Sequence, residues 1–133
     1  CKYSRAGYLR YISIPIQSCS DKILRDMQRG YTSKKLDEIF SKIRDSQLNV
    51  STDIMIGFPG EIEIDFKSSF NFLRKFKPLL SNVLIQRYSK RKNTKAYRMK
   101  NQISEKVKKE RVKILSEFLR DNNIPYRIRD NKY

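Results

Sequence analysis

The hydrophobic pattern along the chain switches between short apolar runs and helical spacing. Alternating or continuous apolar runs predict strands at 9–17, 50–56 and 82–88. Apolar residues spaced three and four apart follow each run, which predicts helices. Pro15 fits poorly in a central ladder, so we expect it at the exit of the first strand or at an unpaired position. Strand and helix therefore alternate three times over.

The predicted helices have recognisable ends. Residues 18–21 offer N-caps to a short helix that Gly30 ends, and Thr32 or Ser33 can cap a second helix. The last helix runs from Ser104 to about residue 122, with a lysine/arginine face outward. Three acidic side chains open the third helix, where the macrodipole favours negative charge: Glu61, Glu63 and Asp65.

Each helix has one apolar face that we expect to be buried. The members of these faces are Ile23, Leu24 and Met27; Leu36, Ile39, Phe40 and Ile43; Ile62, Phe66, Phe70 and Leu73; and Val107, Ile114, Leu115, Phe118 and Leu119. The alternation predicts an α/β fold with a parallel sheet, right-handed crossovers and helices on at least one face. The inner face of such a sheet stays open unless other strands or another chain cover it. Residues 126–129 either extend along the surface or form a short strand.

Composition narrows the functional classes. A chain of 133 residues suits one domain, and no run is long enough to span a bilayer. With no cleavable apolar leader at the N-terminus, we expect a soluble, cytoplasmic protein without a membrane partner. Two cysteines, Cys1 and Cys19, and no histidine exclude a zinc site of the usual Cys/His kind and any mechanism that needs imidazole. We expect reduced thiols, with a disulfide between them as the alternative.

The formal net charge of +16 is unevenly distributed. Residues 87–133 hold 16 Lys/Arg against 5 Asp/Glu, whereas residues 1–86 hold 14 against 9. Such a basic segment is typical of a surface that meets nucleic-acid phosphates. The alternative is a solvated lysine-rich surface that keeps the protein soluble, and charge is compatible with both.

The turn at 57–61, Gly-Phe-Pro-Gly-Glu, directly follows the second predicted strand. Two glycines and a proline stop the strand and let the backbone approach a neighbour closely. In open α/β sheets and in barrels, ligands bind at the carboxyl ends of strands. We therefore place the candidate site at this turn.

Three segments carry a resemblance to a known family. They are SIPIQSCSDKILRDMQRGYT at 13–32, STDIMIGFPGEIEIDF at 51–66 and QRYSKRKNTKAYRM at 86–99, followed by VKKERVKIL. In order, spacing and content they resemble the second half of the radical SAM methylthiotransferases, which insert sulfur and a methyl group into tRNA or a ribosomal protein. Among these, the archaeal/eukaryotic type that acts on threonylcarbamoyladenosine beside the anticodon is the most similar. The resemblance implies that residues 1–122 form βα units four to six of a partial (β/α) barrel, half of a radical SAM TIM-like barrel, with 123–133 as a basic C-terminal extension.

The resemblance also implies that S-adenosylmethionine lies across the carboxyl ends of the strands. The residues it carries over as cofactor-binding are Gln17, Ser18, Asp53, Gly57, Phe58, Pro59, Gly60, Arg87, Tyr88 and Ser89. A carboxylate at Asp53 can hydrogen-bond ribose hydroxyls or attract the sulfonium. Structural alternatives stay open: Gln17 and Ser18 as helix caps, Asp53 as a buried partner of a basic side chain, Tyr88 as core packing, and the 57–61 turn as a simple chain reversal.

The sequence departs from the family at several points. Ser13 stands where the family has histidine, and Cys19 where it has glycine. Lys90, Lys92 and Asn93 replace its usual proline and glycine. The radical chemistry needs a [4Fe–4S] cluster held by three cysteines in a CxxxCxxC motif, which two cysteines 18 positions apart do not provide. We therefore expect no catalytic residue, no metal ligand and no turnover from these residues alone.

The partners follow from the same resemblance. We expect tRNA to contact a basic surface, through the phosphate-binding candidates Lys90, Arg91, Lys92, Lys95 and Arg98. A separate polypeptide that carries the first half of the barrel is a second expected partner. The alternative function is a degenerate, non-catalytic half-barrel that binds nucleic acid or pairs with another chain.

Overall fold

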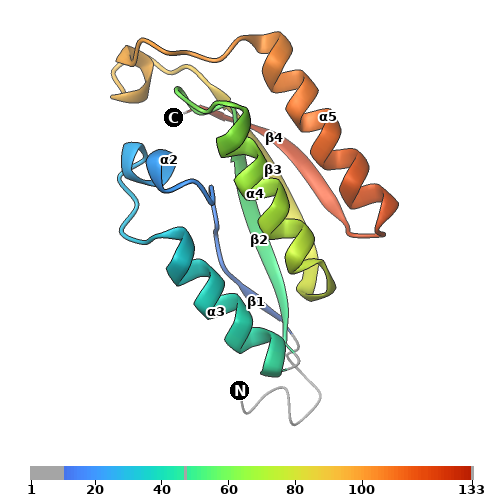
Figure 1. Ribbon diagram of the computed structural model, residues 1–133. Coiled ribbons are helices and arrows are strands. Elements are labelled where there is room, and N and C mark those ends of the chain that lie inside the picture. Colours follow the sequence, from blue (N-terminus) through green and yellow to red (C-terminus); the bar gives the residue numbers. More distant parts are fainter. Residues whose placement is uncertain (1–10, 47, 133) are drawn as a thin grey trace.

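The computed structural model describes residues 11–46 and 48–132 (Figure 1). The elements in chain order are β1 (Tyr11–Ser13), α2 (Asp21–Asp26), α3 (Ser33–Ser46), β2 (Asn49–Ile56), α4 (Glu63–Lys75), the 3₁₀ turn η1 (Lys77–Leu79), β3 (Leu80–Ser89), the 3₁₀ turn η2 (Ala96–Arg98), α5 (Glu105–Asp121) and β4 (Tyr126–Lys132). The predicted residues 9–10 of the first strand lie outside the described residues, as does Cys1.

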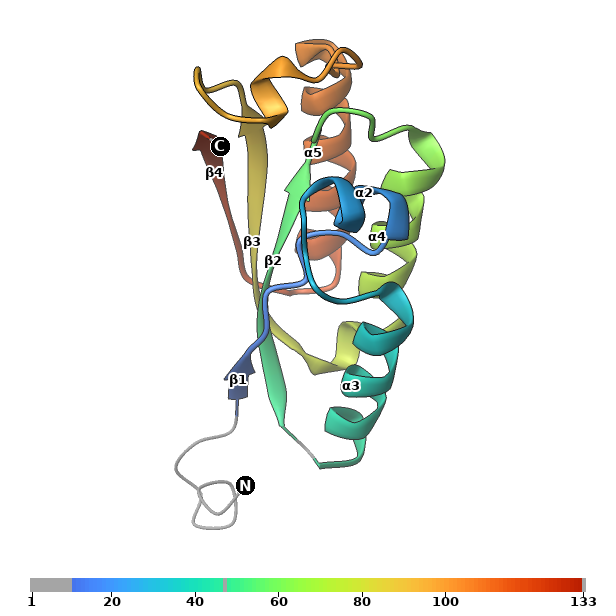
Figure 2. The same cartoon turned by 90° about the vertical axis from the view of Figure 1, so that its left-hand side faces the viewer.

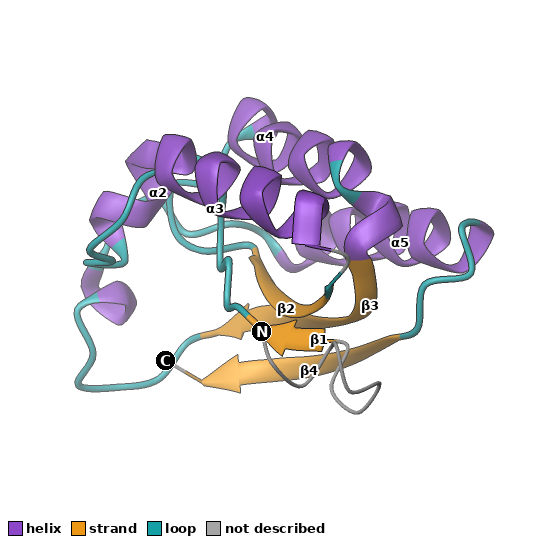
Figure 3. Cartoon of the chain, turned by 90° about the horizontal axis from the view of Figure 1, so that it is seen from below, coloured by secondary structure: helices purple, strands orange, loops and turns teal. Residues whose placement is uncertain are grey.

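The four strands form one parallel sheet in the order β1-β2-β3-β4. The helices lie on one face of this sheet, and the described residues place no helix on the other face (Figure 3). The predicted α/β fold, a partial (β/α) barrel with parallel strands, is confirmed. Residues 126–129, which the sequence left open, belong to a fourth strand that pairs with β3 from Val83↔Tyr126 to Ser89↔Lys132.

The core lies between the helices and the sheet because strand side chains alternate between its two faces. Ile54 and Ile56 of β2 and Ile85 of β3 point toward the helices and are fully buried. Phe40 of α3 packs edge-on against Phe72 of α4, with ring centroids 4.9 Å apart. Alternate strand residues such as Asp53 and Gln86 therefore face the helix-free side.

The helix ends follow the predicted capping chemistry with one exception. Ser20 accepts a hydrogen bond from the Ile23 N–H at the start of α2, and the Thr32 hydroxyl accepts one from the Lys35 N–H at the start of α3. Gly30 does not end α2. The helix stops at Asp26, and the chain turns away through Gln28, which has a φ of +61°.

Two predictions about helix faces are wrong. Ile62 precedes α4 instead of lying on its buried stripe, and 56% of its surface is exposed. On α5, Val107 and Ile114 are exposed by more than a third, whereas Lys108 and Arg111 are almost completely buried. The prediction that the lysine/arginine face of this helix points outward is therefore wrong at Lys108 and Arg111. Their side chains reach polar groups near the ends of β2 and β3, as described below.

Across the described chain, none of the helices has both the length and the apolar character needed to traverse a bilayer.

Gly57, the first residue of the turn after β2, is the sharpest steric constraint in the fold. Its φ is +82°, and a Cβ atom built there would lie 2.5 Å from Cγ of Lys108. We expect Gly57→Ala to lower the free energy of unfolding by about 2–4 kcal/mol, because it adds backbone strain to a steric clash. Urea unfolding measures the change. Gly30→Ala is the matched control, since no atom lies within 4 Å of its added Cβ, and an equal loss there would contradict the steric argument.

Candidate functional site

Three polar side chains from neighbouring strands meet on the helix-free face. Gln17 follows β1, Asp53 lies on β2 and Gln86 lies on β3. Nε2 of Gln17 and Nε2 of Gln86 both donate to Oδ2 of Asp53, at 3.2 and 2.7 Å. We call these three residues the acceptor cluster, because Oε1 of Gln17 and Oδ1 of Asp53 are buried acceptor atoms that have no hydrogen-bond partner within 11–46 and 48–132.

The backbone holds the acceptor cluster in a fixed position. The Gln17 N–H donates to the Asp53 carbonyl at 3.0 Å, and the Met55 N–H donates to the Gln17 carbonyl at 2.8 Å. Gln17 also has a φ of +66°, a conformation that costs a non-glycine residue free energy. Such strain is typical of functional positions, so it adds to the case for a site at Gln17.

Burial raises the pKa of the Asp53 carboxyl group above its ordinary value. Hydrogen bonds to the carboxylate, chiefly one from the backbone, lower this pKa but do not cancel the rise. A cavity of about 380 Å³ opens beside Asp53 on the same side of the sheet. It is lined by Ser13, Pro15, Ser51, Thr52, Asp53, Asn82, Leu84 and Arg127. The two unpartnered oxygens can accept hydrogen bonds from hydroxyl or ammonium groups of a ligand.

The Ser18 side chain is turned into the helical layer. Its hydroxyl accepts from the Ser20 N–H at 3.1 Å and lies 3.5 Å from the Ser69 hydroxyl of α4. Ser18 is fully buried. These contacts support Ser20, which is the N-cap of α2, whereas the Gln17 side chain faces Asp53.

The 57–61 turn is buried beneath the loop that follows β3. The Gly60 N–H donates to the Asn101 carbonyl, and Nζ of Lys22 donates to the Gly60 carbonyl, both at 2.8 Å. Phe58 and Tyr88 pack edge-on with centroids 5.7 Å apart. They belong to a small apolar cluster at the carboxyl end of the sheet, made of Ile23, Met55, Phe58, Tyr88 and Ala96.

The end of β3 combines packing with ion pairing. Tyr88 is fully buried and its hydroxyl has no partner. Arg87 pairs with Asp130 of β4 at 3.0 Å and approaches Glu105 of α5 at 4.0 Å, which directs it toward these elements. The hydrogen bonds with Asp130 raise the pKa of the Arg87 guanidinium. Ser89 is the last, half-buried residue of the strand.

The predicted phosphate-binding residues lie in one exposed loop at the carboxyl end of β3, the orange segment at the top of Figure 2. We call residues 90–100 the basic loop. Lys90, Arg91, Lys92, Lys95 and Arg98 are all exposed. The loop borders a second cavity, of about 200 Å³, whose apolar wall is formed by Met27, Phe58 and Ala96. The structure thus brings the basic loop and the 57–61 turn to the same edge of the sheet.

Sequence reasoning missed two buried cations of α5. Nη1 of Arg111 donates to Oε1 of Glu61 at 2.9 Å and to the Glu61 carbonyl at 2.8 Å. The same Oε1 accepts from the Gly57 N–H at 2.9 Å. Nζ of Lys108 donates to the Tyr88 carbonyl at 2.9 Å, so α5 holds the ends of both β2 and β3.

The helical period contained a signal for these two residues. Positions 108 and 111 stand seven and four residues before Leu115, which is buried, so all three share one face of α5. Gln86 was also missed, although the alternation along β3 places it on the same face of the sheet as Tyr88.

The donor set does not fit an iron–sulfur cluster. The sequence has two cysteines, and in the described part of the chain no three His, Cys, Asp or Glu side chains are grouped to hold a metal ion. Burial raises the pKa of the Cys19 thiol far above its ordinary value. The alternative disulfide with Cys1 lies outside the described residues.

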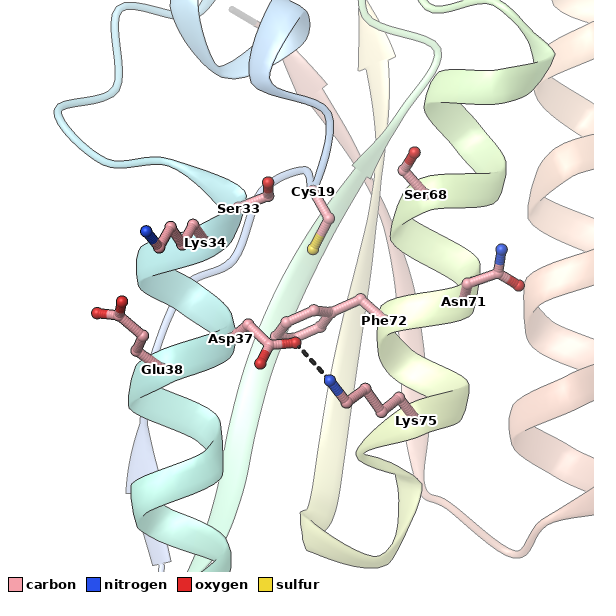
Figure 4. A pocket seen from close by; sticks show the side chains of 9 residues that line it. All are labelled: Cys19, Ser33, Lys34, Asp37, Glu38, Ser68, Asn71, Phe72 and Lys75. Atoms are coloured by element: carbon pink, nitrogen blue, oxygen red, sulfur yellow. Dashed lines mark hydrogen bonds and ion pairs between the residues drawn. The ribbon is translucent and has the colours of Figure 1, made fainter.

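Cys19 lines a cavity of about 580 Å³ between α3 and α4 on the helical side of the molecule (Figure 4). Asp37 and Lys75 form an ion pair of 2.7 Å across this cavity. A thiol that stays protonated is a poor nucleophile and a poor metal ligand, and Cys19 lies on the opposite side of the sheet from the acceptor cluster. We therefore assign the candidate site to the carboxyl end of the sheet.

The Glu61–Arg111 pair predicts a pH-dependent loss of stability. Desolvation by burial raises the pKa of the Glu61 carboxyl group to about 7, although Gly57 and Arg111 oppose the rise. Because this pKa exceeds the unfolded value of 4.5, the group's contribution to stability is complete below about pH 4.5 and is lost as the pH rises through about 7. We expect Arg111→Met to cost about 3–5 kcal/mol at pH 8 and clearly less at pH 5, where Glu61 is protonated and needs no cation.

Urea unfolding of both proteins at the two pH values measures this difference. Arg120→Met, an exposed arginine near the end of α5, is the control and should change the free energy of unfolding by less than about 0.5 kcal/mol. An equal loss for Arg111→Met at pH 5 and pH 8 would show that Glu61 stays charged throughout.

Comparisons with known proteins show which family this chain belongs to. The family model of the radical SAM superfamily matches residues 1–73. A tRNA-2-methylthio-N(6)-dimethylallyladenosine synthase of Methylacidiphilum infernorum is 43% identical over 103 residues, which cover 76% of this chain and 22% of that protein. The ribosomal protein uS12 methylthiotransferase of Caldanaerobacter subterraneus is 39% identical over 83% of this chain and 25% of its own length.

A probable threonylcarbamoyladenosine tRNA methylthiotransferase of Methanocaldococcus jannaschii is 39% identical over 84% of this chain and 26% of its own length. The chain thus spans about a quarter of the length of the curated relatives it matches. Relatives named for three different substrates match at similar identity. From the family model and these relatives together, the chain belongs to the radical SAM superfamily and is similar to its methylthiotransferases.

Proposed function

We propose that this chain is the S-adenosylmethionine-binding second half of a radical SAM tRNA methylthiotransferase barrel. The observation that carries the proposal is the acceptor cluster, with two buried oxygens that have no partner among the described residues, in the carboxyl-terminal half of the sheet. Parallel sheets bind ligands at this edge, and buried acceptors without a partner are rare unless a ligand or water completes them.

The chemistry of the acceptor cluster fits the cofactor. Oδ1 of Asp53 and Oε1 of Gln17 would accept hydrogen bonds from hydroxyl or ammonium groups, and the Asp53 carboxylate would attract a sulfonium. Gln86 orients Asp53 through its 2.7 Å hydrogen bond. When bound, S-adenosylmethionine supplies the carbon radical and the methyl group of the reaction. Gly57 to Gly60 would supply backbone close to the cofactor, positioned by Arg111 and Lys108 from α5.

These 133 residues hold two cysteines, too few for a [4Fe–4S] cluster, so we assign the cluster that cleaves the cofactor to the first half of the barrel. The helix-free face of the sheet supports this assignment, since polar side chains and the 380 Å³ cavity lie there with no helix over them. Parallel sheets are normally covered on both faces. The complete barrel would enclose the acceptor cluster and exclude water from it.

The substrate we propose is tRNA, with a modified adenosine near the anticodon as the target. The basic loop supports this proposal because its exposed cations stand at the same edge as the acceptor cluster and can neutralise phosphates. Two of the three relatives described above are named for modified adenosines in tRNA.

A second candidate is a non-catalytic nucleic-acid-binding half-barrel. The basic loop favours it, because its exposed cations can neutralise phosphates without any cofactor. The two candidates share RNA binding and differ in whether the acceptor cluster binds S-adenosylmethionine.

Cofactor binding is tested at Asp53. Asp53→Asn replaces the unpartnered acceptor with an amide and removes the negative charge, so we expect affinity for S-adenosylmethionine to fall at least about tenfold. Wild-type affinity should fall as the pH is lowered toward the raised pKa of Asp53, and the variant should lose this dependence. Isothermal calorimetry measures both, on the chain alone and mixed with a polypeptide carrying the first half of the barrel.

Asp45→Asn, an exposed position on α3, is the control and should bind like wild type. No binding heat in either preparation would reject the cofactor role and leave the non-catalytic candidate.

RNA binding is tested at the basic loop. Reversing Lys90, Arg91 and Lys92 to glutamate should weaken tRNA binding by about tenfold or more and reduce the slope of log affinity against log salt by about three, because each phosphate contact releases counterions. Filter binding across a salt series measures the effect. A matched reversal of Lys34, Lys35 and Lys42 on the exposed side of α3 is the control. Equal effects of both triple variants would mean that the charge acts without a defined site.

A further inference from the structure

We infer that Tyr97 is a stacking platform for an unpaired base of the RNA strand that the basic loop holds; this inference rests on the proposed RNA-binding function. Among the exposed large hydrophobic side chains of the described chain, Tyr97 is the one aromatic residue, with 38% of its surface exposed. It stands in η2, within the basic loop.

The sequence on either side of Tyr97 carries charge of a single sign. Residues 88–104 contain six lysines and arginines and no aspartate or glutamate. Nζ of Lys90 lies 5.6 Å from the centroid of the Tyr97 ring, so the ring and a phosphate-binding cation form one unit. An aromatic side chain set among cations is the arrangement by which proteins bind single strands, because cations follow the backbone while bases stack on rings.

The turn that carries Tyr97 is preorganised by hydrogen bonds within the chain. The Thr94 hydroxyl donates to the Arg91 carbonyl at 2.7 Å and accepts from the Tyr97 N–H at 3.2 Å. Nε2 of Gln102 donates to the carbonyls of Ala96 and Met99, at 2.8 and 2.9 Å. Because the ring stands on a braced turn, stacking orders little additional chain, which favours binding.

The same turn ties the stacking platform to the candidate site. Ala96, the neighbour of Tyr97, is buried in the apolar cluster with Phe58 and Tyr88. Asn101, just beyond the loop, accepts from the Gly60 N–H at 2.8 Å. A base stacked on Tyr97 would therefore sit at the edge of the sheet where the 57–61 turn and the acceptor cluster lie.

A single RNA strand fits this surface better than a duplex or an acidic protein. In a duplex the base faces are stacked on one another and not available to a side chain. An acidic protein would use the cations of the loop but would gain nothing specific from the face of an aromatic ring. The ring is therefore the feature that distinguishes the proposed partner.

The test compares Tyr97→Leu, Tyr97→Phe and wild type in the 133-residue chain. Fluorescence anisotropy is measured with a labelled unstructured 12-nucleotide RNA and with the same sequence as a duplex. We expect Tyr97→Leu to weaken single-strand binding by about 5- to 100-fold and to leave duplex binding unchanged, since base stacking is lost while charge is kept. Tyr97→Phe should bind like wild type because it keeps the ring. The salt slope should be the same for all three proteins, since no phosphate contact is removed.

The outcomes separate this inference from the proposed function. If Tyr97→Leu binds the single strand as tightly as wild type, or loses single strand and duplex equally, the stacking inference is overturned while the phosphate role of the basic loop stands. If wild type binds neither RNA but binds a polyglutamate peptide, both the inference and the RNA part of the proposed function are overturned. Thermal unfolding of each variant confirms that the fold is kept, as expected for an exposed side chain.

Discussion

The buried pair of Glu61 and Arg111 is the interaction on which the carboxyl edge of this sheet depends. Glu61 accepts from the Gly57 N–H at the start of the turn and from the guanidinium of α5, so one carboxyl group joins a strand end to a helix. Lys108 joins α5 to the end of β3 in a similar way, because its Nζ donates a hydrogen bond to the Tyr88 carbonyl. Burying these cations costs desolvation energy, which a purely structural helix would avoid with apolar residues. Their benefit is positional, because they fix the two strand ends that border the candidate site.

The two faces of the sheet carry different kinds of side chain. Ile54, Ile56 and Ile85 on the helical face form a dry core with the phenylalanines of α3 and α4. The helix-free face carries Asp53 and Gln86, whose mutual hydrogen bond offsets part of the cost of burying polar groups. A rigid core thus supports a polar face, and the exposed cations of the basic loop lie beyond the end of β3. This division is the basis of the cofactor and RNA binding proposed above.

The sequence predicted the strands at 50–56 and 82–88 to within two residues at each end, because apolar periodicity is a local property. It failed where a long-range contact overrides the local pattern. Ile62 matches a helical stripe but lies before α4, and Lys108 and Arg111 match a solvated face but are buried by partners some 20 and 50 residues away in sequence. Asp53 was recognisable as a candidate. Gln17 was a candidate as well, whereas Gln86 was missed, because its contact with Asp53 depends on strand pairing.

By itself, therefore, the sequence determined the α/β alternation, the parallel direction of its first three strands, the turn at 57–61 and the basic character of the loop after residue 89. These features follow from residue types within a few positions of one another. Only the tertiary structure decided that 126–132 is a fourth strand, that Ser18 faces the helices while Gln17 faces Asp53, and that α5 turns two cations inward. Each of these depends on which side chains and backbone groups become neighbours when the sheet closes against its helices, and distance in space is not encoded by local spacing.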